Sequence, residues 1–177
     1  MTLFDSPAFE NHEAVHSFFD EKSGLRCIIA VHSTFRGPAA GGCRMWTYPN
    51  AEAALTDALK LSRAMSYKNA MADLELGGGK AVIIGDSRKA KTPELFEAFG
   101  RAIERVAGRY WTAEDVGVSP ADLMHARKHT KYVAGLEGRR RLHRRPPCAA
   151  AVARAADPAG ADRRHPRFGV VREAAAA

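Results

Sequence analysis

The order of hydrophobic and polar positions predicts that the chain begins with two strands. Residues 13–20 and 25–32 are short runs rich in β-branched and aromatic side chains, and the polar stretch 21–24 separates them. Runs of this kind around a turn-like insert are typical of an antiparallel pair. Two strands do not make a stable domain, so the pair needs further elements to pack against.

A long helix is predicted next. Apolar residues between Ala54 and Met65 recur at three- and four-residue spacing, which places them on one face of an α-helix. Asn50 is a favourable N-cap, and Pro49 precedes it. We therefore predict a helix from Asn50 to about Ala72.

A strand and a second helix follow. Residues 80–85 begin with a lysine and continue as an unbroken apolar run. This is the pattern of a strand that is buried on both faces of a sheet. Thr92 as N-cap and Pro93 at the first helical position then begin an amphipathic helix, which Gly108 closes.

The last elements of this part are a strand over 109–112 and a short helix that begins at 119–122. Strands that alternate with helices predict an α/β fold in which a mixed sheet is flanked by helices. We place this domain at residues 1–137.

Residues 138–177 differ from the rest in composition. The 42 residues from Leu136 onward include 12 Ala, 10 Arg and 4 Pro, and their few large apolar residues keep no period. A segment that buries so little apolar surface is expected to be a disordered tail. Because this mixture is typical of a GC-rich gene read out of frame, we hypothesise a frameshift near Gly138. The alternative is an arginine-rich nucleic-acid-binding segment at 139–145, which we consider the less favoured reading.

Charge is divided unevenly along the chain. The whole sequence carries a formal charge of +7, but residues 1–135 hold 17 basic and 16 acidic side chains. The folded part is therefore nearly neutral, which disfavours nucleic acid as its partner.

The sequence favours a cytoplasmic protein without a metal. Its three cysteines match no disulfide framework or zinc ligand set, and no signal peptide or membrane-spanning run is expected. His125 and His129 are four residues apart, but Arg127 and Lys128 beside them disfavour a metal site.

Candidate chemistry centres on Lys80. Three consecutive glycines, 77–79, precede it, and such a run indicates either close approach of a ligand to the backbone or a tight turn. Lys80 opens its predicted strand, so we expect its ammonium at the sheet edge in a partly dry site. Burial and a second cation such as Lys68 would favour the neutral amine of Lys80, whereas a solvated lysine pair is the plainer alternative.

Asp115 follows a predicted strand at the edge where α/β sheets gather their sites. A carboxylate there can exchange a proton with an amine, or it can serve as a structural cap. Glu114 is expected to be a packing or ion-pair partner. The glycines at 77–79 complete neither of the common phosphate-binding motifs.

Four ordered motifs give the chain a family resemblance: GPAAGGCRMW at 37–46, MSYKNA at 65–70, LGGGK at 76–80 and TAEDVG at 112–117. In order and spacing they resemble the N-terminal substrate-binding and dimerisation domain of the Glu/Leu/Phe/Val amino-acid dehydrogenase family, nearest its leucine and valine branch. The resemblance covers about residues 10–137.

The resemblance implies NAD-dependent oxidative deamination of a branched-chain L-amino acid to a 2-oxo acid and ammonia. It makes Lys80 the general base and Asp115 the group that handles the protons of the amine. Lys68 would bind the substrate α-carboxylate. The remaining substrate-binding residues would be Ala40, the Gly41-Gly42 turn, Met65 and Ala113. Ala40 is smaller than the leucine expected in a leucine enzyme, which leaves the preferred substrate open.

The resemblance also implies a homo-oligomer and a second, Rossmann-type domain that binds NAD. That domain is missing from this sequence, so we expect the truncated chain to be inactive by itself. The alternative is a non-catalytic oligomerisation or binding module derived from a dehydrogenase.

Overall fold

The computed structural model describes residues 3–136, so the predicted tail at 138–177 lies outside the described residues. Along the chain the elements are β1 (Ala14–Asp20), β2 (Leu25–Ser33), β3 (Ala39–Trp46), α1 (Ala51–Met71), β4 (Gly77–Ile84), α2 (Pro93–Arg105), β5 (Tyr110–Glu114) and α3 (Pro120–Arg127).

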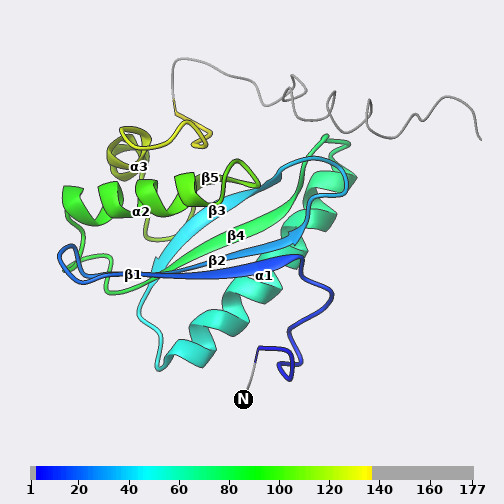
Figure 1. Cartoon of the computed structure of the whole chain (residues 1–177), viewed down its shortest axis with the longest axis horizontal. Helices are drawn as coiled ribbons and strands as arrows, with labels where there is room; N and C mark the ends of the chain where they lie inside the picture. Colours follow the sequence, from blue (N-terminus) through cyan, green and yellow to red (C-terminus); the bar gives the residue numbers. More distant parts are fainter. Residues whose placement is uncertain (1–2, 137–177) are drawn as a thin grey trace, which may run out of the picture. The chain divides into compact units, whose positions relative to one another are not determined.

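The strands form one mixed sheet in the order β1-β2-β4-β3-β5 (Figure 1). β1 pairs with β2 and β2 with β4 in antiparallel fashion. β3 lies parallel to both β4 and β5. The α/β fold with a mixed sheet and the initial antiparallel pair are therefore confirmed.

Helices cover both faces of the sheet (Figure 1). On one face α1 packs Ala58 and Leu59 against Ala30 and Val82. On the other face α2 and α3 pack side chains such as Phe99 against the opposite side of the same strands. The result is a three-layer sandwich whose central strand is β4.

The predicted helix starts are confirmed by their caps. The Asn50 side chain accepts a hydrogen bond from the Ala53 backbone N–H at 2.8 Å. Thr92 caps α2 in the same way, with 3.1 Å from its Oγ1 to the N of Leu95. Ser119 and Asp122 form a reciprocal capping box at the start of α3.

Strand β3 is absent from the sequence prediction, which places Gly41 and Gly42 in a turn. Both residues instead lie inside β3, in parallel register with β5, so the predicted turn is wrong. Small residues have low strand propensity, which hides the strand in the sequence. Close packing explains why small residues stand in this strand, because a Cβ on Gly42 would lie 2.7 Å from the Cβ of Asp115.

Strand β4 begins at Gly77, three residues earlier than predicted. A Cβ on Gly78 would collide with the Oγ and backbone N of Ser66, so the glycines let α1 approach the sheet. Lys80 is therefore the fourth residue of the central strand. The expectation that Lys80 opens its strand at the sheet edge is wrong.

Candidate active site

The site is built around a contact between Lys80 on β4 and Asp115, which directly follows β5. Lys80 Nζ lies 2.6 Å from Asp115 Oδ2. The Lys80 residue is 5% exposed, and the Asp115 side chain is 25% exposed. A buried ammonium is costly without a charged partner, and Asp115 supplies that partner.

Arg44 is the second cation at Asp115. It lies on β3, and its Nε donates to the same Oδ2 of Asp115 at 3.3 Å. Lys68 is the second cation predicted from the sequence, whereas the guanidinium of Arg44 is the group that shares this carboxylate with Lys80. Two cations thus converge on one carboxylate oxygen.

The electrostatics favour an ionised Asp115. Burial by itself would raise the pKa of this carboxyl. The hydrogen bond and charge of Lys80 outweigh burial, the Val116 backbone N–H and the charge of Arg44 add to them, and together they hold the pKa of Asp115 below its ordinary value.

The predicted substrate-binding glycines lie beside this pair. A Cβ on Gly41 would stand 3.0 Å from Cγ of Met65, so Met65 on α1 lies against Gly41. Gly42 is opposite Ala113 in the register between β3 and β5. The structure thus groups most of the predicted site residues on the side of the sheet that α1 covers.

Ala40 and Lys68 are linked to the site through Asn69. Asn69 is buried in α1, and its Nδ2 donates to the carbonyl of Gly77 at 2.6 Å and to that of Ala40 at 3.3 Å. Lys68 precedes Asn69 and is exposed. It is three residues from Met65, so the two side chains lie on the same helix face. The Lys68 ammonium makes no ion pair with another described residue.

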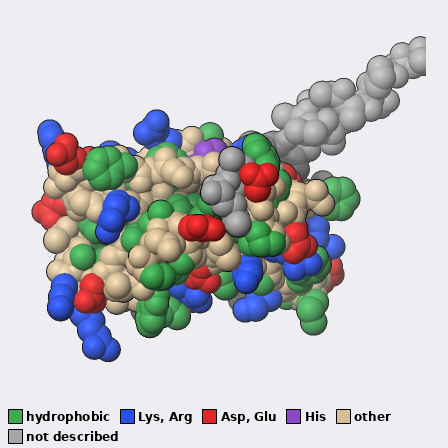
Figure 2. All heavy atoms as spheres, turned by 90° about the horizontal axis from the view of Figure 1, so that it is seen from below, with side chains coloured by type: hydrophobic (Ala, Val, Ile, Leu, Met, Phe, Trp, Pro, Cys, Tyr) green, Lys and Arg blue, Asp and Glu red, His purple; other side chains and the backbone are tan. Residues whose placement is uncertain are grey.

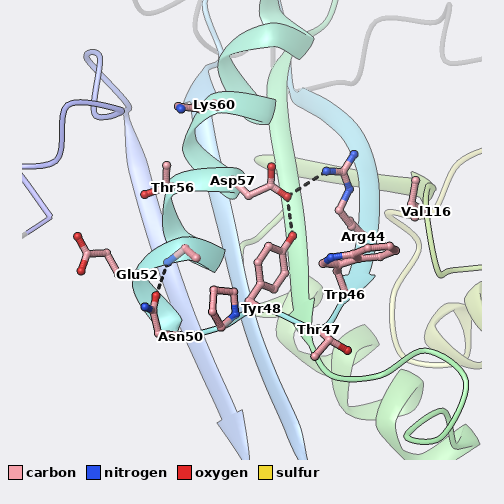
Figure 3. Close-up of a pocket in the computed structure, with 12 residues that line it drawn as sticks. Arg44, Trp46, Thr47, Tyr48, Asn50, Glu52, Thr56, Asp57, Lys60 and Val116 are labelled. Atoms are coloured by element: carbon pink, nitrogen blue, oxygen red, sulfur yellow. Dashed lines mark hydrogen bonds and ion pairs between the residues drawn. The ribbon is translucent and has the colours of Figure 1, made fainter.

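A groove of about 810 Å³ adjoins the charged cluster (Figure 3). Arg44, Asp57 and Tyr48 line it together with the half-exposed Trp46 and Val116. Arg44 Nη1 donates to Asp57 Oδ2 at 3.0 Å, and the Tyr48 hydroxyl donates to the same oxygen at 2.5 Å. Arg44 therefore connects the buried pair with the groove.

Sequence reasoning assigned no role to three residues of this cluster: Arg44, Asp57 and Asn69. Arg44 and Asn69 stand inside the quoted motifs. Arg44 is the one charged residue of GPAAGGCRMW, and that contrast is its signal in the sequence, whereas Asn69 has polar neighbours in MSYKNA and gives no such signal. Asp57 has no such signal in the sequence, because acidic residues are ordinary on the polar face of an amphipathic helix.

Other classes of site find little support in the described residues. No cluster of three His, Cys, Asp or Glu side chains between residues 3 and 136 is able to hold a metal ion. Within the same range no helix is long and apolar enough to cross a membrane. Basic, acidic and apolar side chains are interspersed on the face drawn in Figure 2, as the near-neutral composition predicts.

Comparison with known proteins fits this geometry. The sequence model described as "Glu/Leu/Phe/Val dehydrogenase, dimerisation domain" matches residues 12–132. The chain belongs to the Glu/Leu/Phe/Val dehydrogenase family. The family match spans every described strand and helix.

Individual relatives in this family differ in the substrate that they are named for. The chain is 54% identical over 136 residues to a leucine dehydrogenase of Bacillus subtilis, which covers 77% of this chain and 37% of the relative. It is 53% identical over 125 residues to a phenylalanine dehydrogenase of Caldalkalibacillus thermarum, covering 71% of this chain and 34% of the relative. The chain thus spans little more than a third of these relatives.

Solved structures give the same picture. The L-tryptophan dehydrogenase of Nostoc punctiforme superposes with a TM-score of 0.67 at 45% identity, covering 70% of this chain and 37% of that one. A hetero-hexameric glutamate dehydrogenase of Thermus thermophilus has a TM-score of 0.55 at 20% identity, covering 67% of this chain and 30% of that one, and supports the fold only.

Proposed function

We propose that residues 3–136 are the substrate-binding part of an NAD-dependent dehydrogenase that oxidatively deaminates branched-chain L-amino acids to 2-oxo acids and ammonia. The contact between Lys80 and Asp115 is the observation that carries this proposal. The 2.6 Å contact is short enough for proton transfer, and the small and apolar residues beside it suit an aliphatic side chain, which supports the proposal.

In the proposed reaction Lys68 binds the α-carboxylate of the substrate. Its ammonium is free of ion pairs to other described residues, and it lies one helical turn from Met65 at the site. A charge-assisted bond from Lys68 would fix the carboxylate, while Ala40, Gly41, Gly42, Met65 and Ala113 surround the rest of the substrate.

Lys80 and Asp115 both transfer protons in the proposed reaction. In the structure the two side chains form an ion pair. Transfer of one proton along their 2.6 Å contact leaves Lys80 as a neutral amine, which can then accept a proton from the attacking water. Asp115 exchanges protons with the nitrogen of the substrate.

The hydride acceptor would bind outside the described residues. The glycine run at 77–79 is a buried strand packed under α1, so it does not fit a dinucleotide phosphate. NAD enters the proposal through the family alone, and the residues that would hold it are not among those described. The family's dimerisation domain also supports a homo-oligomer.

A chimera tests the proposed function. Residues 3–136 would replace the matching segment of the Bacillus subtilis leucine dehydrogenase. We expect leucine-dependent NADH formation, and a fall of about 10² to 10⁴-fold in the K80A variant. K89A is the matched control, because Lys89 is an exposed lysine on the loop after β4.

A second candidate, a non-catalytic oligomerisation module, is favoured by the match to a dimerisation domain and by the chain's span of about a third of its relatives. The two candidates differ in ligand binding. Binding of the 2-oxo acid of leucine to the 177-residue chain, weakened by K68A, supports the dehydrogenase. A folded chimera without activity, together with absence of binding, supports the module.

A further inference from the structure

The side-chain partners of Asp115 converge on one of its two oxygens. Lys80 Nζ and Arg44 Nε both contact Oδ2, at 2.6 and 3.3 Å. Oδ1 accepts no hydrogen bond from the side chain of any described residue. The Val116 backbone N–H is a further donor to this carboxylate, and Lys80 and Arg44 are its side-chain partners among the described residues.

Arg44 is itself fixed from its far side. Its Nη1 bonds to Asp57 on α1, and Tyr48 bonds to the same oxygen of Asp57. The guanidinium is planar, so bonds at Nε and Nη1 to two carboxylates set its orientation. A lysine at position 44 would carry the same charge, but it lacks the planar set of N–H donors that bonds to two carboxylates at once.

We propose that Arg44 is a positioning residue for Asp115: held by Asp57, which Tyr48 fixes in turn, it contacts Oδ2 and orients the carboxylate for proton exchange with the substrate amine. This inference rests on the proposed function. Arg44 touches no reacting atom in this scheme and acts through Asp115.

The alternation of charge in this cluster explains why Asp115 has Arg44 as a second cation. Lys80, Asp115, Arg44 and Asp57 alternate in sign, and their side chains are 6%, 25%, 25% and 27% exposed. When Lys80 passes its proton to Asp115 and becomes the neutral base, the ion pair between them is discharged. Arg44 does not deprotonate in proteins, so its positive charge stays beside Asp115 and favours release of that proton to the substrate nitrogen.

The experiment is a pH titration of the Asp115 carboxyl carbon by NMR in the 177-residue chain, assigned with D115N. In R44M the titration midpoint is expected to rise by about one pH unit, because an adjacent cation favours the carboxylate. R44K is expected to fall between R44M and the unaltered chain. R63M is the matched control, since Arg63 pairs with Glu10 on the same side of the sheet.

A midpoint in R44M equal to that of the unaltered chain would overturn the proposal. So would an equal rise in R63M, which would indicate a general loss of positive charge. The amide spectrum checks folding at each pH, and if R44M does not fold, R44K decides the outcome. The titration involves neither substrate nor cofactor, so its result is independent of whether the chimera is active.

Discussion

Asn69 hydrogen-bonds to Gly77 across the interface between α1 and β4, with 2.6 Å from its Nδ2 to the carbonyl oxygen. The same amide reaches the carbonyl of Ala40 on β3. One buried side chain therefore joins the helix that carries Lys68 to the two strands that carry Ala40 and Lys80.

The first prediction concerns Asn69. Substitution by alanine leaves two buried carbonyls without this donor, which is expected to lower the free energy of unfolding by about 1 to 3 kcal/mol. Urea denaturation measures the change. K68A, at the exposed neighbouring position, serves as control and is expected to change stability by less than about 0.5 kcal/mol. Equal stabilities of N69A and K68A would contradict the structural role of Asn69.

The second prediction compares the two members of the ion pair. D115N leaves Lys80 buried next to Arg44, with no anion between the two cations. We expect D115N to lower the free energy of unfolding by about 3 kcal/mol, the low end for a buried pair, because the Asp115 side chain is 25% exposed. K80M leaves Asp115 paired with Arg44, so its cost should be lower by about 1 kcal/mol or more. Chemical denaturation of both variants tests the order, and the reverse order would contradict the shared contact.

The third prediction concerns pH. The folded-state pKa of Asp115 lies below its unfolded value. The stabilisation of the folded state by ionised Asp115 is therefore fully present above the unfolded pKa of about 3.9. It is lost as pH falls through the folded-state pKa. Thermal unfolding of the unaltered chain and D115N should show a constant difference from about pH 5 to 7 that shrinks below about pH 4. A difference independent of pH would argue against an ionised Asp115.

The elements that the sequence predicted well are those with a strong period and a cap. Helix α1 was expected to end at about Ala72 and ends at Met71, and the buried run of β4 was recognised from its apolar residues. Resemblance to the family grouped Lys80 with Asp115, and the structure places the two in contact.

The parts that were missed depend on contacts far apart in the sequence. Gly41 and Gly42 read as a turn because nothing local shows that Met65 and Asp115 pack against them. Arg44 is 71 residues from Asp115 and 13 from Asp57, so no periodic pattern connects them. Packing of this kind becomes visible only when the strands are placed side by side.

The fourth prediction concerns the glycines of β4. A methyl group at Gly78 meets the backbone and Oγ of Ser66, and neither strand nor helix can shift without disturbing the other. G78A is expected to lower the free energy of unfolding by about 1 to 3 kcal/mol. G24A is the control: its residue has a φ of +71° with open space around it, so only backbone strain of about 1 kcal/mol is expected. A smaller effect in G78A than in G24A would contradict the close packing of α1 on β4.

The last prediction concerns substrate size. Ala40 is buried at 7% exposure beside Gly78 and Trp111 in the sheet register, and relatives of this chain are named for leucine, phenylalanine and tryptophan. A leucine at position 40 would fill space that a large substrate side chain needs. In the chimera, A40L is expected to lower kcat/KM for phenylalanine by about 10 to 200-fold relative to valine, since one or a few methylenes in an apolar pocket discriminate by that amount. A90L, at an exposed alanine on the loop after β4, is the control and should leave the ratio unchanged. If A40L lowers the rates for phenylalanine and valine equally, position 40 does not border the substrate side chain, and the assignment of Ala40 to the binding site fails while that of Lys80 and Asp115 stands.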